Sequence, residues 1–451
     1  MNINDETFLN RLVSVIPDKR QTEWQRLEYY NFIHFGMNTF TGREWGSGKD
    51  SPSIFNPVNA DTDQWTRVLK ASGSKGVIFT AKHHDGFCLF PSKYTDYSIK
   101  NSPYKNGKGD FVKELQQSCA KYGLKFGVYL SPWDRHEASY GTAAYNDYFC
   151  NQLEELLTGN GEIFAVWLDG ACGEGKNGLK QTYDFERYYA LIRKLQPDAV
   201  ISICGPDVRW IGNEGGHCRK SEFSVCDKKH TQYSHVSDLS QQEDNSAEMN
   251  KKPDETREDI ASREKLLGAE ELIWYPAETD VSITRYHWFY NKWAELFLTR
   301  TVSELKRIYL NSVGHNSALL LNVPPNKKGL ISKRFENRLK KLGQFLATEF
   351  SNPVNAAFSI KTDYGKYMYE VGFDTASIRK IVLGEDLTKS QRIESFEIFT
   401  EKNNRLIKLA EGFSIGYKEI ALIKKTECDN LKIVINRCRC EPHLSEIKIY
   451  K

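Results

Sequence analysis

Residues 163–170 read Ile-Phe-Ala-Val-Trp-Leu-Asp-Gly. Six apolar residues, rich in β-branched and aromatic types, lead directly into a carboxylate and a glycine, which is typical of a strand buried on both faces of a parallel sheet. In parallel α/β barrels the functional groups lie at the carboxyl ends of the strands. We therefore interpret Asp169 as a chemical group. The alternative is a structural aspartate that caps the following turn.

The rhythm of a strand followed by a helix is repeated around this stretch. Two of the helices carry clear end signals, because Asp61 and Asp110 occupy N-cap positions and Gly73 and Gly123 follow the last apolar residues. Five such units predict a parallel α/β fold, and polar residues at the strand ends favour a (β/α)8-like TIM barrel over a doubly wound sheet. The expected strands are 30–35, 76–81, 125–130, 163–169 and 199–204.

The later part of the chain is less regular. Further strands are expected at 271–275 and 318–323, with a long helix through Trp293, Leu296 and Phe297 between them. Residues 237–263 are polar and charged, which predicts a solvated loop. From about residue 352, short alternating segments predict an antiparallel β-sandwich. We expect a catalytic (β/α)8-like barrel over residues 1–350 and a C-terminal β-sandwich over residues 351–451.

Composition limits the kinds of partner. The 451 residues include 62 Lys and Arg against 59 Asp and Glu, and a net charge of +3 gives no long-range field suited to nucleic acid. A neutral substrate fits better. No stretch is long and apolar enough to predict a membrane span, and the N-terminus lacks the features of a signal peptide. We expect a cytoplasmic protein, or a periplasmic or secreted one whose signal peptide has been removed.

The ten cysteines include no Cys-x-x-Cys pair, so we expect reduced thiols. Cys218, Cys226, His230 and His235 lie close enough in the sequence to imitate a zinc site, but they lack the paired spacing of structural zinc ligands. No metal and no cofactor are expected.

Polar and aromatic side chains gather at the predicted strand ends, which meet at one rim of a barrel. Carboxylates on separate strand ends, histidines that can bind hydroxyls and tryptophans that can stack on a sugar ring together suggest glycoside hydrolysis by two carboxylates. The strand-end residues are His34; Lys82, His83, His84 and Asp85; Tyr129, Ser131 and Trp133; Trp167 and Asp169; and Asp207 with the loop to Glu214.

Two other functions are considered. A metal-dependent barrel hydrolase usually carries His-x-His on its first strand, but here Phe32 stands two residues before His34. A non-catalytic glycan-binding protein on a hydrolase barrel would be expected to lose a catalytic carboxylate, whereas Asp169 and Glu214 are both present.

Five motifs allow a family to be suggested. They are Phe-Ile-His-Phe-Gly at 32–36, Glu-Trp at 44–45, Lys-His-His-Asp-Gly-Phe at 82–87, Trp-Leu-Asp-Gly at 167–170 and Leu-Asn-Val-Pro at 321–324. Together they resemble glycoside hydrolase family 29, the α-L-fucosidases, from about Thr22 to Asn326. The resemblance implies retention of configuration, a fucosylated oligosaccharide or glycoconjugate as substrate, and Asp169 as the nucleophile. The fucose-binding positions that it implies are His34, Glu44, Trp45, His83, His84, Tyr129 and Trp167.

The acid/base is suggested by residues 205–216, Gly-Pro-Asp-Val-Arg-Trp-Ile-Gly-Asn-Glu-Gly-Gly. This stretch resembles the subfamily restricted to branched α-1,3 and α-1,4 fucosides, and the resemblance implies Glu214 as the acid/base. The alternatives are that Glu214 is an exposed loop residue and that Glu278 has this role. The expected function is a retaining α-L-fucosidase that releases terminal α-1,3/1,4-linked fucose from branched, Lewis-type glycans.

Overall fold

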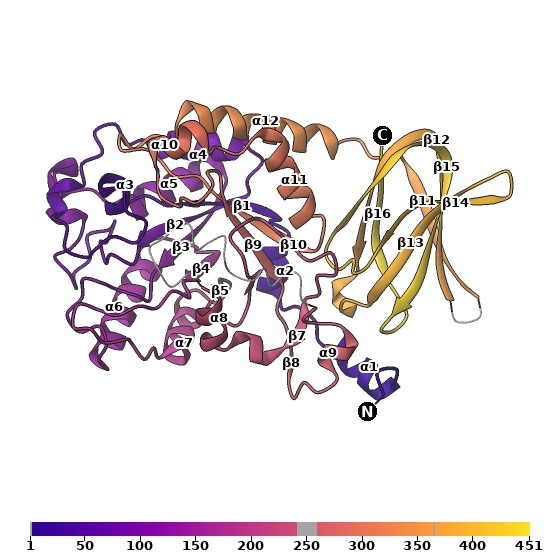
Figure 1. Ribbon diagram of the computed structural model, residues 1–451, viewed down its shortest axis with the longest axis horizontal. Helices are drawn as coiled ribbons and strands as arrows, with labels where there is room; N and C mark the ends of the chain where they lie inside the picture. The colour runs from indigo at the N-terminus through magenta and orange to yellow at the C-terminus, as the bar shows by residue number, and fades with distance from the viewer. Residues whose placement is uncertain (1, 241–258, 364–365) are drawn as a thin grey trace.

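The computed structural model describes residues 2–240, 259–363 and 366–451. It shows a barrel of strands surrounded by helices and, beside it, a C-terminal body made of strands (Figure 1). The larger part of the predicted 237–263 loop lies outside the described residues.

Eight parallel strands form the barrel sheet in the order β5-β4-β3-β2-β1-β10-β9-β6. The two ends of this sheet meet, because the Ile203 N–H donates to the Val208 carbonyl oxygen over 3.0 Å beside the start of β6. The prediction of a (β/α)8-like barrel is therefore confirmed. The strands are β1 Tyr29–Ile33, β2 Gly76–Lys82, β3 Lys125–Leu130, β4 Ala165–Leu168, β5 Val200–Ile203, β6 Arg209–Trp210, β9 Ala277–Ser282 and β10 Ser317–Asn322.

Helices surround the barrel, and their ends follow the signals in the sequence. The Asp61 carboxylate accepts from the Gln64 N–H, the Asp110 carboxylate accepts from the Lys113 N–H, and Gly123 ends its helix with a left-handed φ of 68°. The barrel helices are α4 Thr62–Ala71, α5 Phe111–Tyr122, α6 Ala144–Thr158, α7 Phe185–Leu195, α11 Val302–Ser312 and α12 Lys333–Glu349. Shorter helices are α1 Glu6–Val13, α2 Lys19–Gln25, α3 Met37–Thr41, α8 Tyr233–Leu239, α9 Arg263–Leu266 and α10 Lys292–Phe297. None of the helices in the described ranges is long and apolar enough to cross a membrane.

Both strands expected in the second half of the barrel domain are present, but the long helix between them is not. The strand expected at 318–323 is β10, and the one expected at 271–275 is β8, Leu272–Trp274, which pairs with β7, Val225–Asp227, outside the barrel. The barrel strand is β9, which reads Ala-Glu-Thr-Asp-Val-Ser and lacks the apolar run of a typical buried strand. The long helix expected after it is the six-residue α10, because Thr301 begins a new helix with its own capping box.

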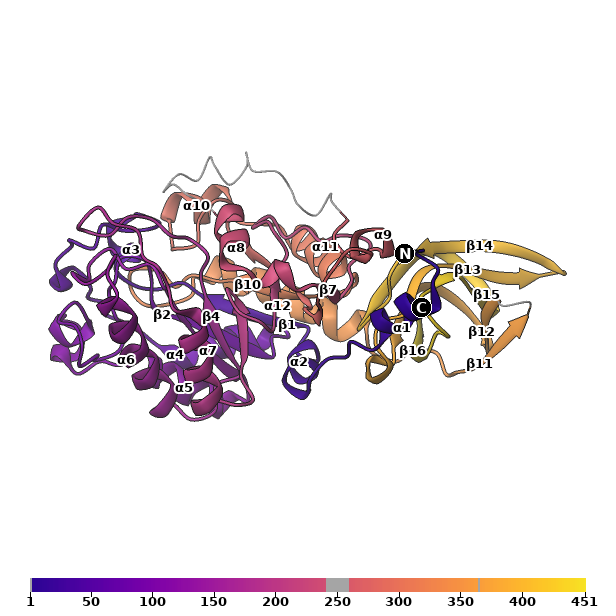
Figure 2. The same cartoon turned by 90° about the horizontal axis from the view of Figure 1, so that it is seen from below.

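The C-terminal body is an antiparallel β-sandwich with its own apolar core. Its longest strands pair over most of their length, and two register shifts interrupt the ladder, as expected where strands bend between layers. Figure 2 shows this body beyond β7 and α9 at one end of the barrel. The expected boundary at residues 350–351 falls between α12 and β11. The strands are β11 Ala356–Asp363, β12 Lys366–Glu385, β13 Ile393–Lys402, β14 Arg405–Gly412, β15 Glu419–Cys438 and β16 Leu444–Tyr450.

Candidate active site

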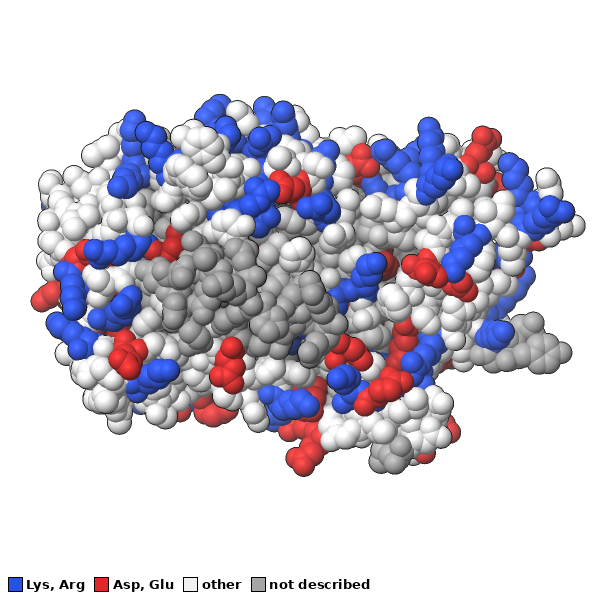
Figure 3. Space-filling view, in the orientation of Figure 1, with Lys and Arg blue, Asp and Glu red and all other residues white. Residues whose placement is uncertain are grey.

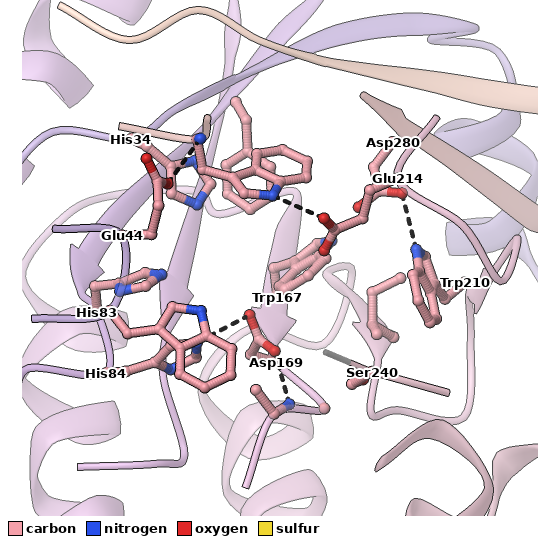
Figure 4. Close-up of a pocket in the computed structure, with 16 residues that line it drawn as sticks. His34, Glu44, His83, His84, Trp167, Asp169, Trp210, Glu214, Ser240 and Asp280 are labelled. Carbon is pink, nitrogen blue, oxygen red and sulfur yellow. Dashed lines mark hydrogen bonds and ion pairs between the residues drawn. The ribbon is translucent and has the colours of Figure 1, made fainter. Parts of the chain in front are cut away.

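One pocket at the carboxyl ends of the barrel strands contains eight of the nine predicted site residues (Figure 4). The cavity left open between their side chains is about 50 Å³. Its lining comprises Phe32, His34, Glu44, Trp45, His83, His84, Trp167, Asp169, Gly170, Ala171, Ile203, Trp210, Glu214, Ser240, Asp280 and Trp288.

Asp169 follows β4 directly, and its side chain keeps 21% of its surface exposed. The carboxylate accepts from the Tyr129 hydroxyl over 3.0 Å and from the Ala171 N–H over 2.8 Å. Burial raises the pKa of Asp169, and these two donors oppose the rise because they stabilise the ionised form. The arrangement holds an oriented carboxylate at the pocket.

His34, His83 and His84 lie just past the ends of β1 and β2, so they no longer have to alternate between strand faces. All three are buried, and burial lowers the pKa of His34 and of His84 to about 3 and the pKa of His83 well below its usual value. The three imidazoles are therefore neutral near pH 7. Together with Asp169 they form what we call the β1–β4 wall.

The partners of two histidines fix which ring nitrogen carries the proton. His34 Nδ1 lies 3.0 Å from the Asn322 side-chain oxygen, an acceptor, so Nδ1 donates. Ser131 donates its hydroxyl to the Trp133 carbonyl oxygen, so it accepts from His84 Nδ1 at 2.7 Å. In both rings Nε2 is left as an acceptor. The two histidines thus offer lone pairs that suit sugar hydroxyls.

Glu214 lies on the loop after β6, and its Oε2 accepts from Trp288 Nε1 over 3.0 Å. The loop is attached to the barrel, since Gly215 bridges to Val281 of β9 and its N–H donates to Asn213 Oδ1 over 2.9 Å. Gly216 has φ 77°, a conformation that favours glycine. The glycine-rich loop thus places the carboxyl through specific contacts.

Three residues that sequence reasoning did not single out share this side of the pocket. Trp210 of β6 donates its Nε1–H to Asp280 of β9 over 2.8 Å, and Trp288 follows β9. Burial and the nearby Glu214 raise the pKa of Asp280 well above its usual value. With Glu214 these three residues form what we call the β6–β9 wall, across the barrel from β2 and β3.

Glu278, the second candidate for the acid/base, lies in the barrel interior and is not part of the pocket lining. Its carboxylate accepts from the Tyr30 hydroxyl and from Trp167 Nε1, the latter over 2.7 Å. Burial raises the pKa of Glu278 to about 7. This residue holds Trp167 in place and does not present an oxygen to the pocket.

The remaining predicted binding residues, Tyr129, Glu44 and Trp45, each have defined contacts. Tyr129 is buried and lies outside the lining, where its hydroxyl supports Asp169. The Glu44 carboxylate accepts from the Trp288 N–H and from His287 Nδ1, both over 2.9 Å. The Trp45 ring meets the Trp133 ring edge-on at 5.2 Å between centroids.

Within residues 2–240, 259–363 and 366–451, no group of three or more His, Cys, Asp or Glu side chains is arranged to hold a metal ion. Cys218 and Cys226 each donate to a backbone carbonyl oxygen, and His230 faces His235 at 3.3 Å. That catalysis needs no metal stays a prediction.

A barrel rim with carboxylates on both walls, imidazole lone pairs and indole rings defines the class of carbohydrate-active barrel enzymes. A family model described as "Alpha-L-fucosidase" matches residues 12–349, so the chain belongs to the α-L-fucosidases, glycoside hydrolase family 29. The family suggested by the five motifs is thus confirmed.

Similar proteins extend the match to the C-terminal sandwich. The chain is 38% identical to "Alpha-L-fucosidase 1" of Arabidopsis thaliana, over 96% of this chain and 87% of that protein. A crystal structure of a candidate α-L-fucosidase from Bacteroides ovatus has a TM-score of 0.90 and 41% identity, and the match covers 100% of this chain and 76% of that one. A Ruminococcus gnavus GH29 fucosidase in complex with fucose has a TM-score of 0.82 and 29% identity, with 97% and 95% of the two chains covered.

Proposed function

We propose that this α-L-fucosidase is a retaining enzyme that releases terminal α-1,3/1,4-linked L-fucose from branched glycans by double displacement. Asp169 is the nucleophile and Glu214 the acid/base. The observation that carries the proposal is that these two carboxyl groups reach one pocket from its two walls, each held by defined hydrogen-bond donors.

In the first step the ionised Asp169 attacks the anomeric carbon. Glu214 gives its proton to the glycosidic oxygen, the bond between carbon and oxygen breaks, and the aglycone leaves. The Tyr129 and Ala171 donors favour the ionised form of Asp169 that this step needs. In the second step Glu214 takes a proton from water, the water oxygen attacks the anomeric carbon, and Asp169 is released.

Asp280 and Trp288 are neighbours of Glu214 in the β6–β9 wall. Asp280 lies near Glu214, because the charge of Glu214 contributes to the raised pKa of Asp280. Trp288 fixes Oε2 of Glu214 by donating to it, which orients the carboxyl group.

The remaining lining suits a deoxy sugar. The acceptor Nε2 atoms of His34 and His84 bind ring hydroxyls, and neutral imidazoles keep this ability throughout the range near neutral pH. Phe32 and Ile203 offer apolar surface to the methyl group of fucose. The proposed mechanism uses no metal and no cofactor.

A hydrolysis panel tests this function. The purified protein is given a branched Lewis-type trisaccharide, linear 2'-fucosyllactose and an aryl fucoside, with Asp169→Asn as the inactive control. We expect efficient release of fucose from the branched substrate and little from the other two. Equal kcat/KM values for the branched and linear substrates would reject the linkage preference, and binding without turnover would favour a glycan-binding protein.

A further inference from the structure

A second cavity, of about 570 Å³, opens beside the sugar pocket. Glu214 belongs to the lining of both, so this side chain separates them. Three arginines contribute to the second cavity: Arg285 follows β9, Arg300 precedes α11, and Arg307 lies on α11. In Figure 3 blue side chains predominate over the region where Figure 1 places α11.

The positive charge of this cavity is only partly neutralised. Arg285 forms an ion pair with Glu304, whose other oxygen accepts from the Thr301 N–H over 2.8 Å at the start of α11. Arg300 donates its Nε–H to the Ser282 carbonyl oxygen over 2.9 Å. Among the described residues neither Arg300 nor Arg307 has a carboxylate within 4.0 Å. In the described part of the chain these three guanidinium groups therefore have one ion pair, from Arg285 to Glu304, and Glu214 is the one acidic side chain in the cavity lining.

The packing of these cations strengthens that conclusion. Arg300 is half-buried, and burial lowers its pKa, with smaller contributions from the charges of Arg285 and Arg307 and an opposing one from Glu304. Like charges held together in this way are stabilised by an anion placed between them. Guanidinium groups match carboxylate and sulfate oxygens, because they donate two parallel hydrogen bonds.

The position of the cavity indicates which part of a substrate would reach it. An acid/base lies next to the glycosidic oxygen, so the aglycone extends from the sugar pocket past Glu214. The cavity beyond Glu214 is therefore on the aglycone side. Tyr286, which is 37% exposed, adds an aromatic ring to its lining.

We propose that this cavity is a subsite for an anionic substituent of the aglycone, a carboxylate or a sulfate ester, bound by Arg300 and Arg307 while Glu304 holds Arg285. The proposal deepens the proposed function and rests on it, because it needs Glu214 to stand between fucose and aglycone. Neutral branched glycans remain substrates, and anionic ones are preferred.

The test compares three substrates that share one fucosylated core: the neutral Lewis-type oligosaccharide, its 3'-sulfated form and its 3'-sialylated form. We expect the wild-type kcat/KM to be about tenfold higher for at least one anionic form, the gain expected from one hydrogen bond between charged groups. The preference should fall as salt is added, because these exposed charges are screened. Which anionic form is preferred identifies sulfate or carboxylate as the group bound.

Variants locate the effect. Arg307→Ala should bring the ratio of anionic to neutral kcat/KM close to 1, and Arg300→Ala should do the same if it folds. Lys306→Ala is the matched control, since Lys306 neighbours Arg307 on α11 but lies over the Phe345 ring, 4.5 Å from its centroid, and should keep the ratio. Equal wild-type rates on all three substrates, or a preference that Arg307→Ala preserves, would overturn the subsite while leaving the fucosidase function intact. If fucose is released from none of the three substrates, the proposed function is rejected instead.

Discussion

The two walls of the sugar pocket are built in different ways. Each residue of the β1–β4 wall stands within two residues of the end of a parallel strand, where neighbouring strands fix its position. The β6–β9 wall combines a two-residue strand, a polar strand and two irregular segments, held by contacts such as the one from Trp288 to Glu214. The first wall is suited to holding the sugar that every substrate shares. In the proposed mechanism the second carries the acid and faces the variable aglycone.

This contrast makes predictions about substrate dependence. Changes in the β1–β4 wall should impair all fucosides alike, whereas changes in the β6–β9 wall should depend on the leaving group and on what surrounds it.

The largest effect is expected from Asp169→Ala. Loss of the proposed nucleophile would remove the covalent step, so kcat/KM should fall by about 10⁴-fold or more for natural and aryl fucosides alike. Steady-state kinetics on both substrate types measures this, with an unchanged unfolding temperature as the control for folding. A loss limited to one substrate type would contradict the assignment of Asp169 to the common step.

Glu214→Ala should show the difference between the two walls, because its effect should depend on the leaving group. Loss of the general acid should lower kcat for natural glycosides by about 10²- to 10⁴-fold. Aryl fucosides with acidic phenols should lose far less in the first step, because such leaving groups need little protonation. Equal losses on both would move the acid role to another carboxyl group, with Asp280 the next candidate in the lining.

Glu278→Gln tests how the ionisation of the buried Glu278 carboxyl affects the stability of the fold. Since the folded-state pKa of Glu278 is raised to about 7 from an ordinary 4.5, the folded protein holds a proton that the unfolded chain releases in this range. The stability contributed by the neutral carboxyl is therefore present below pH 4.5 and is lost as the pH rises through 7. Glutamine cannot ionise, so the wild type should lose about 3 kcal/mol of unfolding free energy relative to Glu278→Gln between pH 4.5 and 8.

Urea unfolding of both proteins at several pH values measures this difference. A constant difference would mean that Glu278 ionises in the folded protein as it does in the unfolded chain.

Tyr129→Phe should shift a pH profile. The Tyr129 hydroxyl lowers the pKa of Asp169 by donating to its carboxylate, so its removal should raise that pKa. Because the proposed mechanism needs ionised Asp169, the acid limb of kcat/KM should move upward by about one pH unit, the equivalent of a hydrogen bond worth about 1.4 kcal/mol. An unmoved acid limb with a uniform loss of activity would indicate only a packing role.

The smallest effect is expected from chelators and reductants, which should leave kcat/KM unchanged for every fucoside. The two walls contain no cysteine, and the proposed mechanism gives no role to a metal ion. Activity lost with chelator and restored by zinc would instead indicate a zinc site in the segment from Cys218 to His235.

The sequence predicted the β1–β4 side of the barrel better than the β6–β9 side. The strands β1 to β5 and the helix caps at Asp61 and Asp110 were predicted because apolar periodicity and capping residues are local signals. The β1–β4 wall followed from those strands, since a residue just past a parallel strand lies on the barrel rim.

The β6–β9 wall could not be predicted in the same way. Strand β9 carries Glu278 and Asp280 on the face turned to the barrel interior, and a strand with buried carboxylates resembles a loop by composition. The spacing of these two acids by two residues was the one signal that could have placed Asp280. No signal in the sequence indicates the position of Trp288, because this position depends on Glu44, which is distant in the sequence.

In the proposed mechanism Asp169 attacks from the β face of the sugar. The most direct measurement is azide rescue of Asp169→Ala on an activated aryl α-L-fucoside, with the product anomer determined by nuclear magnetic resonance. A small anion in the space left by the carboxylate should restore part of the activity and give the β-fucosyl azide. An α-fucosyl azide, or near-normal activity without azide, would show that Asp169 is not the nucleophile.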